Sequence, residues 1–111
     1  MLLNQTTGKI ISKNEIVCKT VFSRARGLMF RKRHNLIMIL PEELKISLHM
    51  FFVFYPIGVF ITDRNGRIVE IKRNFRPFTF WNSKEKGKYV VELSELNVQV
   101  RRGDKIKLNL D

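Results

Sequence analysis

The chain has 111 residues, of which 21 are Lys or Arg and 10 are Asp or Glu, so its formal net charge is +11. This length predicts a single domain over residues 1–111 without room for a second core. The apolar fraction of 44% excludes a largely disordered chain, and the single cysteine, Cys18, excludes an internal disulfide and fits a reducing compartment. The basic surplus favours an anionic partner, and charge alone leaves nucleic acid, an anionic membrane surface, an acidic protein or a merely solvated surface open.

The N-terminal segment MLLNQTTGKII lacks the basic start and the apolar run of a signal peptide. The longest apolar run, residues 50–55, ends at Pro56 and is far shorter than a membrane span. We therefore expect a cytoplasmic protein with no membrane span.

In the first third of the chain, alternation of apolar residues predicts a strand over residues 15–21, in which Cys18 is a small core residue. From Ser23, a plausible N-cap, apolar residues follow at helical spacing and predict a short helix. The basic residues 31–34 (RKRH) then form a turn, most simply a solvated connection.

The middle of the chain is the most apolar. Residues 36–40 (LIMIL) predict a strand that Pro41 stops. Residues 47–54 are apolar on both alternating faces, which predicts a strand covered on both sides. Pro56 ends that strand, and residues 58–63 resume extended structure.

The last half contains clear turn signals. The DRNG sequence at residues 63–66 predicts a hairpin turn, because Asn and Gly tolerate the positive φ that such turns require. Residues 74–83 are irregular and aromatic, and residues 84–87 read as a charged turn. Further strands are expected over residues 67–72, 88–93 and 105–110.

These elements predict an α+β, β-rich fold. We expect a small, mostly antiparallel, barrel-like or sandwich domain of six to seven short strands with one or two short helices. The alternating helical patterns of a doubly wound fold are absent from the sequence.

The order of several short motifs resembles that of a known family. These are Arg26-Gly27-Leu28-Met29-Phe30-Arg31, LHMFFVFYPI, ITDRNG, YVVEL and RRGD. The chain is similar, from about residue 13 to its end, to domain of unknown function 192, which is also called uncharacterised protein family 0127. The resemblance implies a compact β-rich domain and no established activity.

Positions where the chain matches the family pattern, and positions where it departs from that pattern, both bear on function. The resemblance implies that Asp63, Gly66, Glu92 and Asp104 occupy family positions. Where members carry an aspartate after their Ile-Pro-type turn, this chain has Gly58, so a role of that aspartate would be missing here. The family's late glycine is also replaced, by Ser94-Glu95. Many bacterial relatives look exported, with a leader or anchor, and we expect neither in this chain.

An enzyme is the weaker hypothesis. General acid–base chemistry requires a histidine or a raised-pKa carboxyl group beside a second polar group. His49 is the candidate within a strand, with Asp63, Glu92 and Asp104 as partners, although a histidine hydrogen-bonded inside a barrel is the simpler interpretation. No nucleophile elbow or phosphate-binding glycine loop is present, and the spacing of the histidines and the cysteine is not that of a zinc site. We therefore predict no catalytic residues, no metal and no cofactor.

Residues 75–81 (FRPFTFW) interleave aromatic and basic side chains, a composition typical of proteins that stack single-stranded bases and neutralise phosphates. Alternatively, these aromatics cap one end of the core under a long loop. The binding hypothesis requires at least two of the four rings of this segment to be exposed beside Arg76. Arg101 and Arg102 could extend the surface. The candidates for anion contact are Arg31, Lys32, Arg33, Arg76 and Trp81.

The sequence thus predicts a monomeric or weakly associating, non-enzymatic module that binds an anionic partner, with nucleic acid favoured. The alternative is a small-ligand or protein-docking module that uses a pocket near His49 and Asp63, for which an apolar lining of Met50, Phe52 and Trp81 would be favourable. Asp63 also has a simpler role as the first residue of a tight turn.

Overall fold

The structure is a computed structural model that describes residues 1–20, 24, 27–29, 31–96 and 99–110. Eight strands make up the regular structure of these residues. They are β1 (Leu2–Asn4), β2 (Lys9–Ser12), β3 (Glu15–Cys18), β4 (Asn35–His49), β5 (Ile57–Thr62), β6 (Ile68–Phe75), β7 (Phe80–Leu93) and β8 (Ile106–Leu108).

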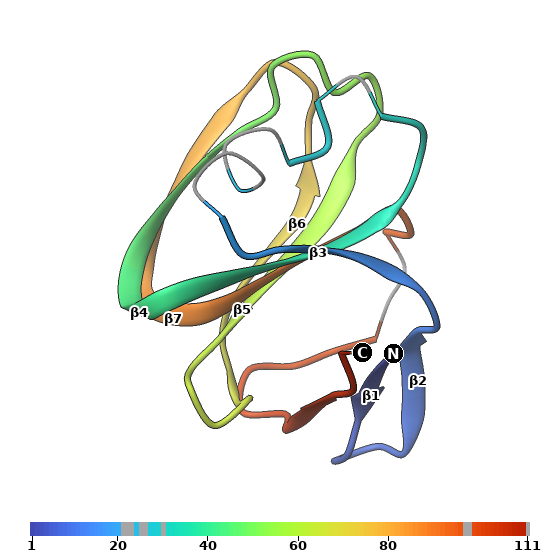
Figure 1. The fold of residues 1–111 in the computed structure, drawn as a ribbon, viewed down its shortest axis with the longest axis vertical. Helices are drawn as coiled ribbons and strands as arrows, with labels where there is room; N and C mark the ends of the chain where they lie inside the picture. The colour runs from blue at the N-terminus through green and yellow to red at the C-terminus, as the bar shows by residue number, and fades with distance from the viewer. Residues whose placement is uncertain (21–23, 25–26, 30, 97–98, 111) are drawn as a thin grey trace.

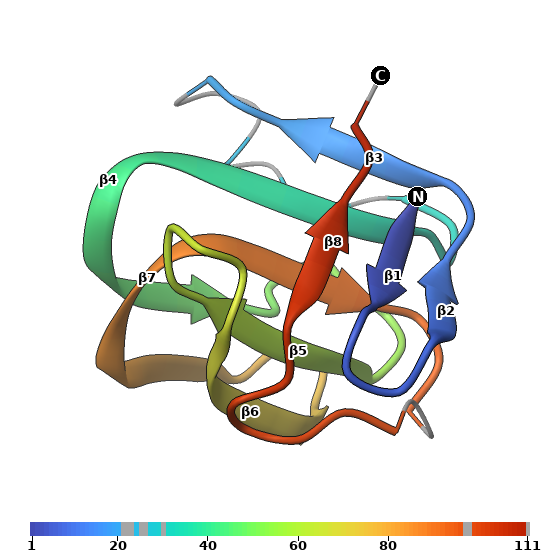
Figure 2. The same cartoon turned by 90° about the horizontal axis from the view of Figure 1, so that it is seen from below.

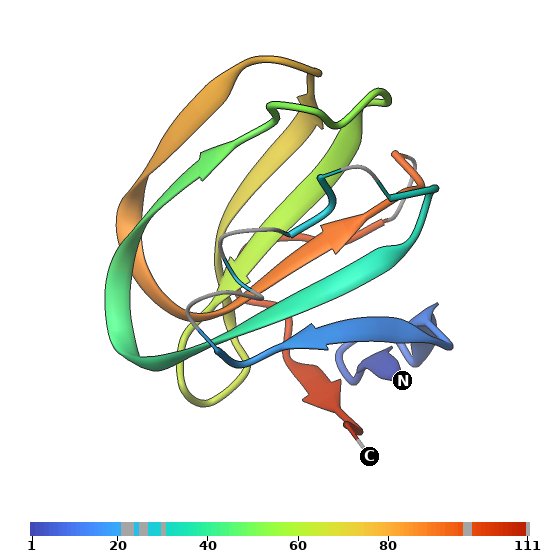
Figure 3. The same ribbon diagram turned by 45° about the horizontal axis from the view of Figure 1, so that its top comes forward.

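Five strands form the larger sheet in the order β3-β4-β7-β5-β6. β3 runs parallel to β4, and the other pairings in this sheet are antiparallel. β4 and β7, with 15 and 14 residues, are long and strongly bent, and they curve together around one side of the molecule (Figure 1; Figure 3). The sheet has β3 and β6 as its outer strands and does not close into a barrel within the described residues.

The smaller sheet has the order β2-β1-β8 and is antiparallel throughout. Seen from below, β1, β2 and β8 lie across the larger sheet, and the two chain ends lie close to them (Figure 2). An isolated bridge between Arg67 and Lys105 connects the β5–β6 turn to the segment that leads into β8.

The curved sheet separates two apolar clusters. Leu36 and Met38 of β4 join the cluster on its concave side, whereas Ile37 joins the cluster between the two sheets. Since the strand is buried on both faces, its sequence LIMIL is apolar without alternation. Cys18 is 1% exposed and belongs to the concave cluster, which confirms it as a core residue.

The hairpin turn predicted from DRNG is confirmed. The amide of Gly66 donates to the carbonyl of Asp63 at 3.1 Å, and Gly66 has a φ of 84°. The Asp63 carboxylate accepts hydrogen bonds from the amides of Asn65 (2.9 Å) and Arg67 (3.0 Å). Asp63 therefore stabilises the turn by the short-range bonding typical of an Asx residue.

The mostly antiparallel, β-rich class is confirmed, but several details are wrong. There are eight strands instead of six to seven, since β1 and β2 add two short strands near the N-terminus. β4 continues through Pro41, and β7 continues through the residues 84–87 that were predicted to turn. The β4–β7 register shifts between Ile39 and Leu44, so Pro41 lies at an irregularity, where a missing amide donor is tolerated.

The one or two short helices are not borne out. Among the described residues of the predicted segment, Arg24 has helical hydrogen bonding and residues 27–29 form a turn. The rest of the segment, including the N-cap candidate Ser23, lies outside the described residues. The strand predicted over residues 47–54 ends at His49. The following apolar residues form a loop with exposed rings instead of a strand covered on both sides.

Candidate functional site

Two connecting segments lie side by side at the end of the molecule opposite the smaller sheet (Figure 1). One joins β4 to β5 and the other joins β6 to β7. The amide of Met50 donates to the carbonyl of Thr79 at 2.7 Å, and the amide of Phe78 donates to the carbonyl of Met50 at 2.8 Å. Backbone hydrogen bonds therefore fix the two segments to each other.

Phenylalanine side chains of these segments are exposed to solvent. The exposed fractions are 44% for Phe51, 45% for Phe52, 65% for Phe54, 51% for Phe78 and 73% for Phe80. The Phe78 ring contacts the Phe52 and Phe54 rings edge to face, with centroids 6.2 and 5.6 Å apart. We call residues 50–56 and 76–80 the aromatic end. Exposed apolar surface gathered in this way is typical of a binding site.

The backbone of the aromatic end is strained. Phe52 and Phe78 both have a φ of 60°, in the left-handed region. For a residue with a bulky side chain this conformation costs about 1–2 kcal/mol. Strained residues of this kind concentrate at functional sites, where surrounding contacts hold them.

The basic residues 31–34 lie against one side of the aromatic end. The Tyr55 hydroxyl donates to the carbonyl of Lys32 at 3.0 Å, and the Arg33 guanidinium lies 4.9 Å from the centre of the Tyr55 ring. Burial raises the pKa of Tyr55 above its usual value, and the charge of Glu92 adds to this effect. Tyr55 therefore holds this basic turn in place beside the exposed rings.

A shallow groove of about 370 Å³ adjoins the aromatic end on another side. Basic and neutral polar side chains line it together with one exposed ring. They include Lys72, Asn74, Arg76, Thr79 and Phe80. The exposed ring of Phe80 thus lies beside Arg76 in this groove, and Phe78 is a second exposed ring of residues 75–81. Anion contact by this segment stays a prediction.

The predicted anion-contact residues differ in their exposure to solvent and in their contacts. Lys32, Arg33 and Arg76 are exposed. Arg31 is half-buried, and its Nε donates to the carbonyl of Gly27 at 3.0 Å. Trp81 is also half-buried and packs edge to face on the buried ring of Phe75, with centroids 6.3 Å apart. Trp81 is therefore chiefly a packing residue.

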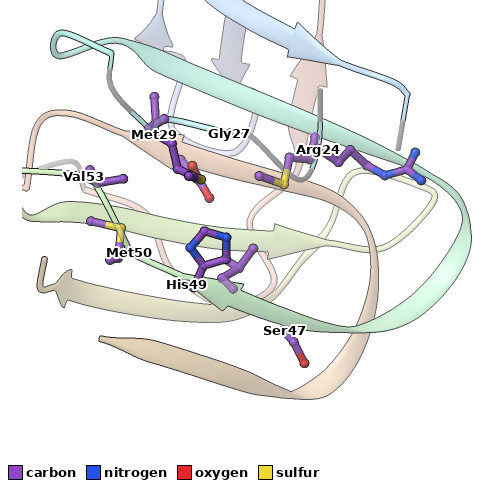
Figure 4. Close-up of a pocket in the computed structure, with 11 residues that line it drawn as sticks. Arg24, Gly27, Met29, Ser47, His49, Met50 and Val53 are labelled. Atoms are coloured by element: carbon purple, nitrogen blue, oxygen red, sulfur yellow. The ribbon is translucent and has the colours of Figure 1, made fainter. Parts of the chain in front are cut away.

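A second feature is a cavity of about 100 Å³ between the β3–β4 connection and β4 (Figure 4). In the close-up, Gly27 and Met29 lie on one side, and His49, Met50 and Val53 lie on the other. Its apolar lining comprises Leu28, Met29, Met38, Leu48, Met50 and Val53.

Glu92 of β7 also lines this cavity. It is 5% exposed, and burial raises the pKa of its carboxyl group to about 7. Arg24 is another lining residue, but its Nη1 donates to the carbonyls of Lys19 (2.7 Å) and Ile39 (3.2 Å). The ion pairs of the described residues involve Glu15 and Glu43, so none of them neutralises Glu92.

His49 is exposed and is not the interior histidine that the simpler interpretation expected. Its Nδ1 accepts a hydrogen bond from the Phe51 amide at 3.3 Å, and its ring stacks on that of Phe51. It lines the cavity together with Met50. Asp63, Phe52 and Trp81 do not line it, so the structure does not bring Asp63 and His49 together there.

Within the described residues, no helix has the length and apolarity needed to cross a membrane. No three His, Cys, Asp or Glu side chains of those residues are arranged to hold a metal ion together.

The fold and the two features define a small β-rich domain with an exposed aromatic end and a cavity beneath it. The family model DUF192, described as "Uncharacterized ACR", matches residues 3–108. The chain belongs to this family, which confirms the resemblance seen in the sequence.

Relatives share the family designation. The chain is 36% identical to a UPF0127 protein of Thermococcus sibiricus, over 96% of this chain and 73% of that protein. It is 35% identical to a UPF0127 protein of Thermococcus gammatolerans, over 83% of this chain and 62% of that protein. A UPF0127 protein of Thermococcus kodakarensis is 32% identical over 83% of this chain and 60% of its own length. The chain thus spans about three fifths of the last two relatives.

Two solved structures are similar. A protein of unknown function from Novosphingobium aromaticivorans has a TM-score of 0.76 at 19% identity, over 85% of this chain and 74% of that one. A protein from Sinorhizobium meliloti described as "a putative transcription regulator" has a TM-score of 0.84 at 23% identity, over 96% of this chain and 88% of that one. At these identities the likeness establishes a shared fold.

Residues from three of the five motifs that carried the family resemblance meet at the cavity, although they lie far apart in the sequence. Gly27, Leu28 and Met29 come from one motif, Met50 from the second and Glu92 from YVVEL. Gly58 is not one of the lining residues. The sequence suggested Glu92 as a possible partner of His49 but did not predict the cavity. The family motifs were the signal in the sequence that could have located it.

Proposed function

We propose that the protein binds single-stranded nucleic acid through its aromatic end, as a binding module and not as an enzyme. One observation carries the proposal: five exposed phenylalanine rings gather at one end of the molecule, beside exposed lysine and arginine side chains. The cytoplasmic location and the monomeric or weakly associating state remain predictions from the sequence.

The physical argument is that single strands present two kinds of surface. Each base has a face that stacks on an aromatic ring, contributing about 1–3 kcal/mol per base, and each phosphate has a charge that Lys or Arg neutralises. Phe54 and Phe80, the most exposed rings, supply the first kind of contact. Arg33 and Arg76, one on each side, supply the second.

Charge and shape both favour this partner. Neither of the ion pairs of the described residues involves a cation of the aromatic end, so these charges are available to an anion. The groove that holds Arg76 and Phe80 also presents the amide of Asn74 and the hydroxyl of Thr79, which suit hydrogen bonds to a sugar–phosphate strand. A bilayer surface would need the rings and the charges but not a polar groove.

The test is a salt titration of binding to a mixed pool of single-stranded RNA and DNA, followed by fluorescence anisotropy. We expect log affinity to fall linearly with log salt, with a slope near −0.7 for each phosphate neutralised. Arg76→Ala should make the slope shallower by about 0.7. Phe80→Ala should weaken binding about 5- to 150-fold at unchanged slope, as expected for a lost stacking contact.

Matched controls lie near the smaller sheet. Lys13→Ala removes an exposed cation, and Ile10→Ala removes an apolar side chain that is 53% exposed. Neither should change the affinity or the slope. No binding at roughly 50 mM salt would overturn the proposal, given the salt dependence expected of phosphate contacts. So would phenylalanine-dependent binding to vesicles of phosphatidylserine in the absence of binding to single strands, since that would make the aromatic end a membrane-docking surface.

A further inference from the structure

We propose that the cavity at Glu92 is a binding site for a primary ammonium group carried on a short aliphatic stem. The cavity lies beneath the aromatic end and shares Met50 and Val53 with it, but the binding of an ammonium group there does not depend on nucleic-acid binding. Two sources share this chemistry, a free alkylamine and the side chain of a lysine in another polypeptide.

The lining of the cavity matches the two parts of such a ligand. Methionine, leucine and valine side chains surround the space, and the Glu92 carboxyl group is the acidic group among the lining residues. Methylene groups gain stability in an apolar lining of this kind, and flexible methionines adapt to the shape of a ligand. A buried carboxylate gains most from a partner that brings both a positive charge and hydrogen-bond donors, which an ammonium does.

The charged groups that the structure describes around Glu92 are bonded to other partners. Arg24, from the β3–β4 connection, directs its guanidinium to two backbone carbonyls. Tyr55 donates its hydroxyl proton to Lys32, and the nearby Arg31 donates to Gly27. His49, from β4, is exposed and accepts a backbone hydrogen bond. Among the described residues, no Lys, Arg or His side chain forms an ion pair with Glu92.

The volume of the cavity limits the length of the aliphatic stem that it can hold. At about 100 Å³ it is smaller than an apolar cavity of about 150 Å³ that accepts benzene. By this comparison it accommodates a chain of about four to five heavy atoms. The butylammonium portion of a lysine side chain falls within this range, and the rest of a longer ligand would remain outside the cavity.

The first experiment follows the methionine methyl groups by NMR in the full chain during titration at pH 8 with n-butylammonium, n-butanol and n-butyrate. We expect n-butylammonium to shift the methyl signals of Met29, Met38 and Met50, which line the cavity. Met1, which does not line it, is the internal control. The uncharged alcohol should bind at least tenfold more weakly and the anion should not bind. Equal binding of the alcohol, or an absence of shifts, would overturn the proposal.

The second experiment uses Glu92→Gln, which keeps the shape of the side chain, with Glu95→Gln as a control because Glu95 is exposed and does not line the cavity. In the unmodified protein, affinity for n-butylammonium should rise about 100-fold from pH 5 to pH 8, since the Glu92 carboxyl group ionises near pH 7. Glu92→Gln should bind weakly at every pH, and Glu95→Gln should keep the affinity and the pH dependence of the unmodified protein. A pH-independent affinity in the unmodified protein would contradict the proposal even if Glu92→Gln failed to fold.

The two sources are distinguished by a titration with Nα-acetyl-lysine amide. If it shifts the same methyl signals as n-butylammonium, the site accepts a lysine side chain of a polypeptide. If n-butylammonium alone binds, the ligand is a free amine. Both outcomes support the ammonium site, and neither depends on whether the protein binds nucleic acid.

Discussion

A carboxyl group as deeply buried as that of Glu92 links folding to pH. Its pKa is raised from 4.5 to about 7 by burial, so the folded chain holds this proton over a pH range in which the unfolded chain has released it. The free energy of unfolding therefore falls as pH rises from about 4.5 to about 7. Above pH 7 it is lower by about 3 kcal/mol than it is below pH 4.5. Below pH 4.5 the folded and the unfolded chain both hold the proton, so this loss of stability is absent.

We predict that Glu92→Gln removes this dependence. The free energy of unfolding of the variant minus that of the unmodified protein should increase by up to about 3 kcal/mol between pH 4.5 and pH 8. Urea unfolding at several pH values measures it. Glu95→Gln, at an exposed position in the segment after β7, should stay within about 0.5 kcal/mol throughout. A constant difference between Glu92→Gln and the unmodified protein would contradict the raised pKa.

At the scale of elements, Gly87 allows β7 to pass closely over β5. A Cβ atom there would lie 2.0 Å from Cγ2 of Ile61 and 3.1 Å from the carbonyl oxygen of Thr62. Gly58 of β5 differs, since a Cβ atom there would meet the carbonyl oxygen of Glu95 at an ordinary 3.6 Å. The two glycines are therefore a matched pair within one sheet.

We predict that Gly87→Ala lowers the free energy of unfolding by about 1–3 kcal/mol, because Ile61 must move within a packed core. Gly58→Ala should raise it by up to about 1 kcal/mol by restricting the unfolded chain. Chemical unfolding of both variants measures the difference. Equal stabilities would show that the close approach at Gly87 is readily relieved.

The loops of the aromatic end hold exposed rings at the expense of backbone strain. Phe78 is 51% exposed and has a φ of 60°. Phe78→Gly relieves the left-handed strain while losing ring contacts with Phe52 and Phe54, so the free energy of unfolding should change by less than about 1 kcal/mol. Phe75→Ala, at a ring that is 1% exposed, should lower it by about 3–5 kcal/mol. Thermal unfolding compares them, and a large loss in Phe78→Gly would make Phe78 a structural residue.

The same loops show where sequence patterns fail. The DRNG turn was predictable because its bonding involves adjacent residues. The strand over residues 47–54 was predicted too long, because hydrophobic periodicity treats an exposed ring and a buried ring alike. The passage of β4 through Pro41 depends on a register irregularity against β7, a contact between distant segments that local propensity cannot encode.

At the scale of the whole molecule, the candidate site is formed by segments that lie far apart in the sequence, and no local sequence pattern shows that they meet. The basic residues 31–34 were predicted as a solvated turn, and the Tyr55 contacts bring them to the aromatic end. Glu92 was a candidate only through its family position, and its burial against the cavity follows from the pairing of β7 with β4 and β5. An anionic partner, expected from composition, stays a prediction, whereas the location of the cavity required the fold.

One buried hydrogen bond joins the two ends of the chain. Asn4 is fully buried, and its Nδ2 donates to Oδ2 of Asp104 at 2.9 Å; the same Oδ2 accepts from the amide of Arg101 at 3.0 Å. Asp104 is 8% exposed. Because β1 pairs with β8 just beyond Asp104, this bond fixes the smaller sheet at the point where the chain ends meet.

We predict that Asn4→Ala and Asp104→Ala each lower the free energy of unfolding by about 1–3 kcal/mol, because each leaves a buried polar partner unsatisfied. The double variant should lose less than the sum, with a coupling of about 0.5–3 kcal/mol in a double-mutant cycle. Arg102→Ala, at an exposed position in the adjacent turn, should stay within about 0.5 kcal/mol. Amide exchange at Leu2 and Leu3 should accelerate in both single variants, since the smaller sheet opens more easily. Additive losses with unchanged exchange would show that the smaller sheet is held by its apolar contacts alone.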